Sequence, residues 1–180
     1  PRDPAGGLGG SGARGRLGVD GGVYGADESV LATGARPREM PFMPIDGEHV
    51  LSSRHALELR RLPASMVVVG SGAIGSEFAW FYATLGVKVT LVEYLPRIMP
   101  LEDEEVSKTM ERVFRKLRAT VLTSTTVRSV VVGADGQCVV EVEGRKGVES
   151  LSAEGVLSAV GLTSNSPGIG LAAPGLAAAR

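Results

Sequence analysis

Apolar residues are spaced in two different ways along the central part of this chain. Short apolar runs are typical of strands that are buried on both faces of a sheet. Longer stretches between these runs carry apolar residues three or four positions apart, which predicts amphipathic helices. We expect buried strands at 66–69, 88–92, 120–122 and 156–161, and helices at 73–85 and 103–117. This strand-helix-strand-helix-strand order indicates an α/β protein with a parallel sheet.

A second group of strands is expected before the last of these parallel strands. Residues 127–132 and 138–143 are apolar or alternating, and the segment 133–136 between them, Gly-Ala-Asp-Gly, is a hairpin signal. Residues 148–153 can add a third strand. The sequence therefore predicts an antiparallel meander in place of a helix that crosses over between parallel strands.

The spacing also indicates which side of each helix is buried. In the second helix, acidic residues crowd the start and basic residues the end, which suits the helix dipole of an ordinary surface helix and gives no reason to assign catalysis. The first helix is expected to bury Ile74, Phe78, Phe81 and Leu85, and the second Val106, Met110, Val113, Phe114 and Leu117.

Upstream of the sheet, the pattern is weaker. Residues 29–32 suggest a short buried strand that runs into a turn at 33–37, and Pro37, Pro41 and Pro44 then favour an extended connector. Ser52 and Ser53 can cap a short helix that continues to Leu62, where Pro63 stops it. The apolar side of that helix is expected to hold Ala56, Leu57 and Leu59.

Composition divides the chain into four parts. Residues 1–18 are dominated by glycine and are expected to be disordered or of low complexity. Residues 19–62 precede the parallel sheet, 63–163 hold it, and 164–180 form an Ala- and Gly-rich tail. The best-defined chemistry is expected in the part from 63 to 163.

The loop Gly70-Ser71-Gly72-Ala73-Ile74-Gly75 joins the strand at 66–69 to the following helix. Its three glycines allow a sharp turn, close approach of a pyrophosphate to the backbone, and close packing of helix on strand. The pyrophosphate of a dinucleotide would lie at the helix N-terminus. A glycine-rich turn without a ligand is the alternative, since this spacing also arises by chance in a chain with 25 glycines.

Glu93 indicates which dinucleotide the loop would bind. It ends the strand 88–92 and lies 18 positions after Gly75. At that place a carboxylate can accept hydrogen bonds from both ribose hydroxyls and would repel a 2′-phosphate. The implied cofactor is NAD rather than NADP; a solvated charge at a strand end is the simpler alternative. Together these features predict a Rossmann-like dinucleotide-binding fold.

Charge and cysteine content narrow the possible partners. Nineteen basic and 20 acidic residues give a net charge of −1, and the basic residues are scattered, so nothing favours nucleic acid or an anionic membrane. No apolar run reaches the ~20 residues of a membrane span, and we expect a cytoplasmic protein. Cys138 is the only cysteine and is expected to be buried and inert; no metal site or catalytic residue is predicted.

Several motifs together give the chain a family resemblance. The segments Leu31–Pro37, Gly75–Phe78, Val92–Pro100 and Ala159–Gly161 resemble the flavin- and NAD-dependent disulfide oxidoreductases. Within that family they most resemble the dihydrolipoamide dehydrogenases. The resemblance implies the FAD/NAD(P)-binding fold, in which 19–62 would be the end of an FAD domain and a connector, 63–163 the NAD domain, and 164–180 a truncated tail.

The same resemblance implies roles for individual residues. The family's NAD site corresponds to Gly70, Ser71, Gly72, Ala73, Ile74, Gly75, Ser76 and Glu77, with Glu93, Val127 near the adenine and Gly161 near the nicotinamide ribose. Thr33, Gly34 and Ala35 would touch the flavin. Judged without the family, the segment 33–35 is an ordinary turn. His49 and His55 match no histidine of the family and are expected to be surface residues.

The family chemistry also needs parts that this sequence does not match. These are the FAD-binding βαβ unit with its Cys-x4-Cys pair, the Gly-Asp segment of the FAD site, and a dimerisation domain with a His-Glu couple. We therefore expect the NAD-binding portion of a flavoprotein that oxidises dihydrolipoyl groups of a lipoyl-bearing protein with NAD⁺ through FAD. The alternatives are an inactive truncated NAD-binding module, or a fragment of a related NADH-dependent flavin oxidoreductase. Dimer formation, known in the family, is left open.

Overall fold

The computed structural model describes residues 16–19, 21–28, 30–169 and 171. These divide into two compact units, one from Pro37 to Gly161 and one formed by the segments on either side. The central unit contains a five-stranded sheet of β4 (Val50–Leu51), β5 (Ser65–Val69), β6 (Lys88–Val92), β7 (Thr120–Leu122) and β11 (Gly155–Ser158). All neighbouring strands are parallel, in the order β4-β11-β5-β6-β7.

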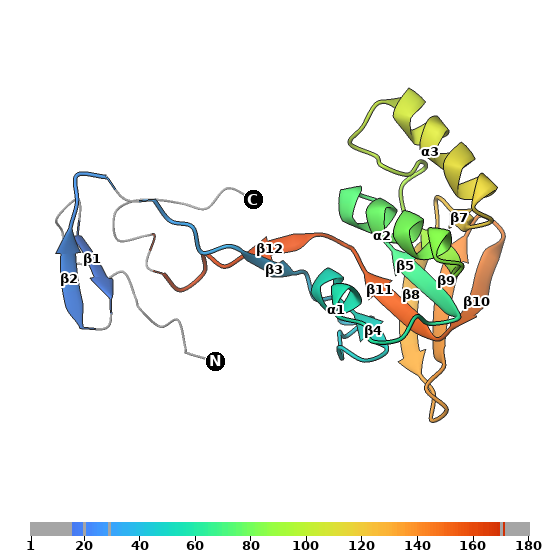
Figure 1. The fold of residues 1–180 in the computed structure, drawn as a ribbon, viewed down its shortest axis with the longest axis horizontal. Coiled ribbons are helices and arrows are strands. Elements are labelled where there is room, and N and C mark those ends of the chain that lie inside the picture. The colour runs from blue at the N-terminus through green and yellow to red at the C-terminus, as the bar shows by residue number, and fades with distance from the viewer. Residues whose placement is uncertain (1–15, 20, 29, 170, 172–180) are drawn as a thin grey trace. The chain divides into compact units, whose positions relative to one another are not determined.

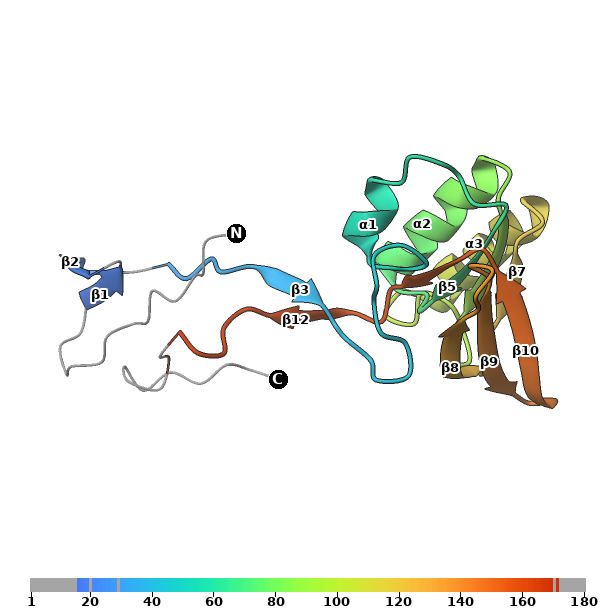
Figure 2. The ribbon, with the colours of Figure 1, turned by 90° about the horizontal axis from the view of Figure 1, so that it is seen from below.

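The parallel sheet is the middle one of three layers (Figures 1 and 2). Helices α1 (Ser53–Leu57), α2 (Ala73–Thr84) and α3 (Glu104–Lys116) cover one face. The antiparallel meander of β8 (Thr126–Val132), β9 (Cys138–Gly144) and β10 (Gly147–Ala153) covers the other. The expected α/β fold, with a meander in the place of a crossover helix, is therefore confirmed.

Side chains of β5 alternate between two hydrophobic cores. Met66 and Val68 belong to the core under the helices, and Val67 and Val69 to the core under the meander. This alternation follows from the two-residue repeat of a strand. It explains the unbroken apolar run of β5, because neither face of the strand meets water.

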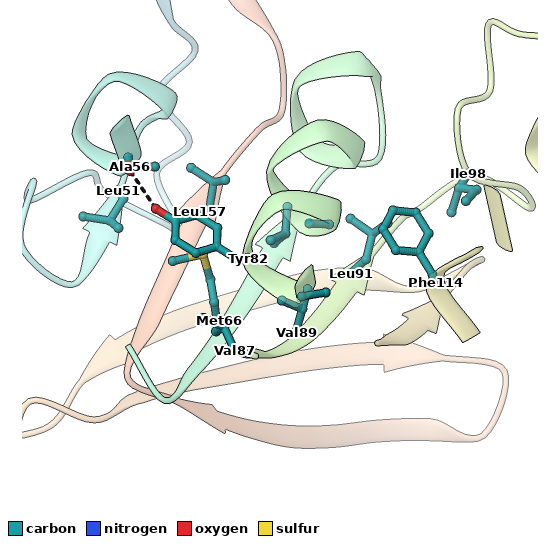
Figure 3. Packing of buried hydrophobic residues seen from close by; sticks show 13 residues of the cluster. Leu51, Ala56, Met66, Tyr82, Val87, Val89, Leu91, Ile98, Phe114 and Leu157 are labelled. Carbon is teal, nitrogen blue, oxygen red and sulfur yellow. Dashed lines mark hydrogen bonds between the residues drawn. The ribbon is translucent and has the colours of Figure 1, made fainter. Parts of the chain in front are cut away.

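The helix-side core is centred on α2 and α3 (Figure 3). Tyr82 is 1% exposed, and its hydroxyl donates a hydrogen bond of 2.6 Å to the carbonyl of Ala56. Phe114 is fully buried beside Leu91 and Ile98. The contact through Tyr82 ties the short helix α1 to the long helix α2.

The expected buried side of α2 is wrong for Phe81 and Leu85, whereas Phe78 packs against the helix-side core as expected. The helix buries Gly75, Ser76, Ala79, Tyr82 and Ala83. Phe81 is 46% exposed and Leu85 48%. At the start of α2 only glycine fits, because a Cβ atom on Gly75 would lie 1.8 Å from the carbonyl oxygen of Gly70, which directly follows β5. Apolar residues all around this helix made its periodicity a poor guide to the buried side.

Helix α3 is confirmed, and α1 is shorter than expected. Glu104–Lys116 lies within the expected 103–117. Phe114, near the end of α3, is fully buried as expected, whereas Val106 is 39% exposed. Helix α1 begins with Ser52 as N-cap and ends at Leu57, not at Leu62. In this single short turn only Ala56 faces the core, and Leu57 is 77% exposed.

The flanking segments form two small paired elements. Strand β1 (Arg16–Val19) pairs with β2 (Gly22–Gly25), and β3 (Ala35–Pro37) pairs with β12 (Leu162–Ser164). Residues 16–18, expected to be disordered, thus lie in a strand, while residues 1–15 are outside the described part.

The strand expected at 29–32 is not found among its described residues, 30–32. Val30 is 91% exposed there. No neighbouring strand in the described residues covers this apolar run, so it has no sheet in which to be buried.

Candidate dinucleotide site

The glycine-rich loop joins the carboxyl end of β5 to the start of α2. Gly70 has φ +96°, and its N–H donates to the carbonyl of Val92 at 2.9 Å, which joins the loop to β6. A Cβ atom on Gly70 would lie 2.5 Å from the carbonyl oxygen of Ala159, and one on Gly75 would lie 1.8 Å from the carbonyl oxygen of Gly70. Both glycines are therefore needed because backbone segments meet closely here.

Gly72 differs from these two glycines. It is exposed, has φ −62°, and a Cβ atom there would meet no other atom within 4 Å. Gly72 is the N-cap of α2, and no side chain caps that helix end. The open space and the uncapped N–H groups fit the pyrophosphate of a dinucleotide.

Glu93 lies beside this loop and is only 3% exposed. Its Oε2 atom accepts hydrogen bonds from the Ser71 N–H at 2.8 Å and from the Ser71 hydroxyl at 2.6 Å. Its Oε1 atom accepts from the N–H of Leu95 at 2.9 Å. The structure thus brings together the two features that the sequence singled out, the glycine loop and the acid at the end of β6.

Ser71 links the loop to a further segment. Its carbonyl accepts hydrogen bonds of 2.9 Å from the N–H of Met99 and from the hydroxyl of Ser76. Met99 has φ +46°, a left-handed conformation that is uncommon for methionine. No feature of the sequence indicated that Met99 supports the loop, because this contact depends on the path of the chain after β6.

The remaining expected residues of α2 lie on its first turns. Ala73 and Glu77 are exposed, and Ile74 is half-buried. Ala73, Ser76 and Glu77 line a mainly apolar groove with Trp80, Phe81, Met99, Met110 and Val113. An acid near the start of a helix is favoured by the helix dipole whether or not a ligand is bound, so the role of Glu77 in the NAD site stays a prediction.

Val127 lies near the start of β8, which reaches the end of β6, and Gly161 lies two residues after Ala159, which meets the glycine loop. The N–H of Thr125 donates to the carbonyl of Glu93 at 2.9 Å, which places the start of β8 beside Glu93. Val127 is only 5% exposed, and its side chain packs in the meander-side core, so its contact with an adenine stays a prediction. Gly161 has φ +103°, and its carbonyl accepts from the N–H of Arg38 at 3.0 Å.

Thr33, Gly34 and Ala35 belong to the flanking unit. Gly34 has φ +72°, and its carbonyl accepts from the N–H of Asn165 at 3.0 Å. The amide Nδ2 of Asn165 donates to the carbonyl of Thr33 at 3.1 Å. Gly34 thus has the left-handed conformation of a turn residue, and contact of this segment with a flavin stays a prediction.

The other polar candidates have local roles. His55 Nδ1 accepts from the N–H of Ser52 at 3.2 Å as part of the capping box of α1. Cys138 is fully buried, and its pKa is raised by burial and then by the charge of Asp46. No cluster of three or more metal-ligating side chains occurs among the described residues. None of the helices in the described part of the chain has the length and hydrophobicity needed to cross a membrane.

Comparison with known proteins gives a consistent result. The family model described as pyridine nucleotide-disulphide oxidoreductase matches residues 12–179. Dihydrolipoyl dehydrogenase of Chlorobaculum tepidum is 42% identical over 158 residues, which are 88% of this chain and 34% of that protein. The dihydrolipoyl dehydrogenase of Rhizobium etli is also 42% identical, over 86% of this chain and 32% of that protein.

Solved structures agree with the sequence relatives. LpdA of Mycobacterium tuberculosis has a TM-score of 0.78 and 31% identity, and the likeness covers 92% of this chain and 36% of that chain. A NAD-dependent persulfide reductase of A. fulgidus has a TM-score of 0.67 and 28% identity, over 84% of this chain and 29% of that chain. The chain spans about one third of the length of these relatives. It belongs to the pyridine nucleotide-disulphide oxidoreductase family.

Proposed function

We propose that this chain is the NAD-binding portion of a flavoprotein similar to dihydrolipoyl dehydrogenase. The observation that carries the proposal is the Glu93 carboxylate held against the N-terminal end of the glycine loop. A carboxylate at this place binds ribose hydroxyls and opposes a 2′-phosphate. NAD rather than NADP is therefore the proposed dinucleotide.

The residues present fit such a ligand. Gly72 would let the pyrophosphate approach the backbone, and the uncapped N-terminus of α2 would stabilise its charge. Glu93 would orient the adenosine ribose. NAD, when bound, supplies the hydride acceptor, while the protein binds and orients it. Glu77 and Gly161 are proposed to lie toward the nicotinamide end.

The proposed parent reaction is oxidation of a protein-bound dihydrolipoyl group by NAD⁺ through FAD. The names of the sequence relatives support it. Thr33, Gly34 and Ala35 are proposed to contact the flavin at the end of an FAD domain that includes 19–62, and the NAD domain is assigned to 63–163. A lipoyl-bearing protein would be the partner, in a cytoplasmic enzyme.

A second candidate function is favoured by the cysteine content. This chain has one cysteine, Cys138, which is fully buried. A dithiol that exchanges with a disulfide needs two thiols in reach of each other. On its own the chain would therefore be a NAD-binding module without the dithiol reaction. A third candidate for the parent enzyme is a related NADH-dependent flavin oxidoreductase. The NAD-dependent persulfide reductase among the structural neighbours supports it.

Two experiments test these proposals. Calorimetric titration of the purified chain with NAD and with NADP should show saturable binding of NAD that is clearly tighter than binding of NADP. No binding of NAD, or tighter binding of NADP, would contradict the assigned cofactor.

Sequencing the DNA on both sides of the coding segment distinguishes the candidate parent enzymes, because a dihydrolipoyl dehydrogenase should show Cys-x4-Cys upstream and His-x4-Glu downstream.

A further inference from the structure

The Glu93 carboxylate is already well supplied with hydrogen-bond donors. Two come from Ser71, its N–H and its hydroxyl, and both reach Oε2; the third is the N–H of Leu95, at Oε1. An ionised carboxylate offers about four lone-pair positions in all. One position is therefore left, whereas the two hydroxyls of an adenosine ribose would need two.

The three donors differ in how easily they can leave. The backbone at Ser71 is held by the hydrogen bond from Met99 N–H to the Ser71 carbonyl, at 2.9 Å. The backbone at Leu95 is held by the hydrogen bond from Ser124 N–H to the Leu95 carbonyl, at 2.8 Å. The Ser71 hydroxyl can leave Oε2 by rotation about a single side-chain bond. It is the donor that a ligand can displace without moving the chain.

We propose that the Ser71 hydroxyl occupies, on Glu93 Oε2, the position of one ribose hydroxyl and is displaced when an adenosine dinucleotide binds. Burial supports this exchange, because Ser71 is 0% and Glu93 3% exposed, so the carboxylate needs a substitute donor when no ribose is present. Ser71 is then a positioning residue that acts through Glu93. The proposal rests on the NAD binding proposed above.

The test compares two ligands on two proteins. ADP carries the ribose hydroxyls and the pyrophosphate, while 2′,3′-dideoxy-ADP lacks both hydroxyls. The ratio of their dissociation constants measures what the hydroxyls contribute, whatever else Ser71 does at the loop. In Ser71→Ala the ribose no longer competes with the serine hydroxyl, so the preference for ADP over dideoxy-ADP should rise about three- to tenfold above that of the wild type.

Control variants keep the result interpretable. Ser107→Ala removes another buried serine hydroxyl, 1% exposed on α3, which donates to the carbonyl of Asp103 and not to Glu93, and should leave the ratio unchanged. Ser71→Gly keeps the loop N–H and replaces Ser71→Ala if circular dichroism shows that the alanine variant is unfolded.

The outcomes separate this proposal from the proposed function. If the wild type binds neither NAD nor ADP, the proposed function fails and the exchange fails with it. If the wild type binds both, but removing the Ser71 hydroxyl leaves the ratio unchanged or lowers it, only the exchange is overturned.

Discussion

At the scale of single residues, the three glycines of the loop have two separable roles. Gly70 and Gly75 are required by neighbouring backbone, whereas Gly72 faces open space. The sequence motif already predicts a separate role for each: a sharp turn at Gly70, close approach of a pyrophosphate at Gly72, and close packing of helix on strand at Gly75. The structure assigns folding to two of them and leaves the third available for a ligand.

Gly72→Val should therefore abolish measurable NAD binding and leave the fold intact. The valine side chain would fill the space proposed for the pyrophosphate. The backbone at position 72 has φ −62°, which suits any residue. Isothermal titration measures the binding, and circular dichroism checks the fold. Normal NAD affinity in this variant would show that the phosphate does not lie on this loop.

Gly75→Ala, unlike Gly72→Val, should destabilise the fold. It should lower the free energy of unfolding by roughly 1–3 kcal/mol, because the new Cβ atom would collide with the backbone. That atom would lie 1.8 Å from the carbonyl oxygen of Gly70. Urea denaturation measures the change. Gly72→Ala is the matched control, whose new Cβ meets no atom within 4 Å. Equal stability of the two variants would refute the close-packing argument.

At the scale of elements, the attachment of α1 to α2 depends on one buried hydroxyl. Tyr82→Phe removes the hydrogen bond to the carbonyl of Ala56 and leaves that carbonyl without this partner. The expected loss is about 1–2 kcal/mol in the free energy of unfolding. Thermal or urea unfolding at neutral pH measures it. An unchanged stability would mean that the hydroxyl is not buried as described.

The same tyrosine should make stability depend on pH in alkaline solution. Burial raises the pKa of Tyr82 above its ordinary value of 10.0, so the folded state holds the phenol proton more tightly than the unfolded state. This contribution is complete below pH 10 and is lost as the pH rises through the higher folded pKa.

Urea unfolding at several pH values above neutrality tests this prediction. Tyr82→Phe should flatten the alkaline decline in stability. The comparison is made in a Cys138→Ala background, because burial also raises the pKa of that thiol. An equally steep decline with and without Tyr82 would contradict the prediction.

Individual elements show what the sequence could predict and what it could not. The strand 66–69, the loop and Glu93 follow from local patterns whose geometry is nearly fixed, so the βαβ unit was predictable. The buried side of α2 was predictable only in part, because apolar residues lie all around this helix: Phe78 packs against the core, while Phe81 and Leu85 are about half exposed. The contact between Ser71 and Glu93 joins residues 22 positions apart and depends on how β6 lies beside β5.

At the scale of the whole molecule, the chain spans about one third of its relatives' length and carries one cysteine. We expect the purified chain to be colourless and to reduce lipoamide with NADH no faster than background, even with added FAD. NADH would have no bound flavin to accept its hydride, and there would be no redox-active dithiol to pass the electrons to lipoamide. Visible absorbance and NADH consumption measure this, with Gly72→Val as control. Stoichiometric yellow flavin, or turnover above that control, would contradict the expectation.

The central claim is that Glu93 selects NAD through its ribose, and titration of Glu93→Ala tests it most directly. Loss of charge-assisted hydrogen bonds should weaken NAD binding by roughly 1.5–3 kcal/mol and leave NADP binding unchanged or stronger. Glu141→Ala, which removes an exposed carboxylate on β9, should change neither affinity. Circular dichroism establishes that each variant is folded. Equal NAD affinity in folded Glu93→Ala and wild-type protein would contradict the account.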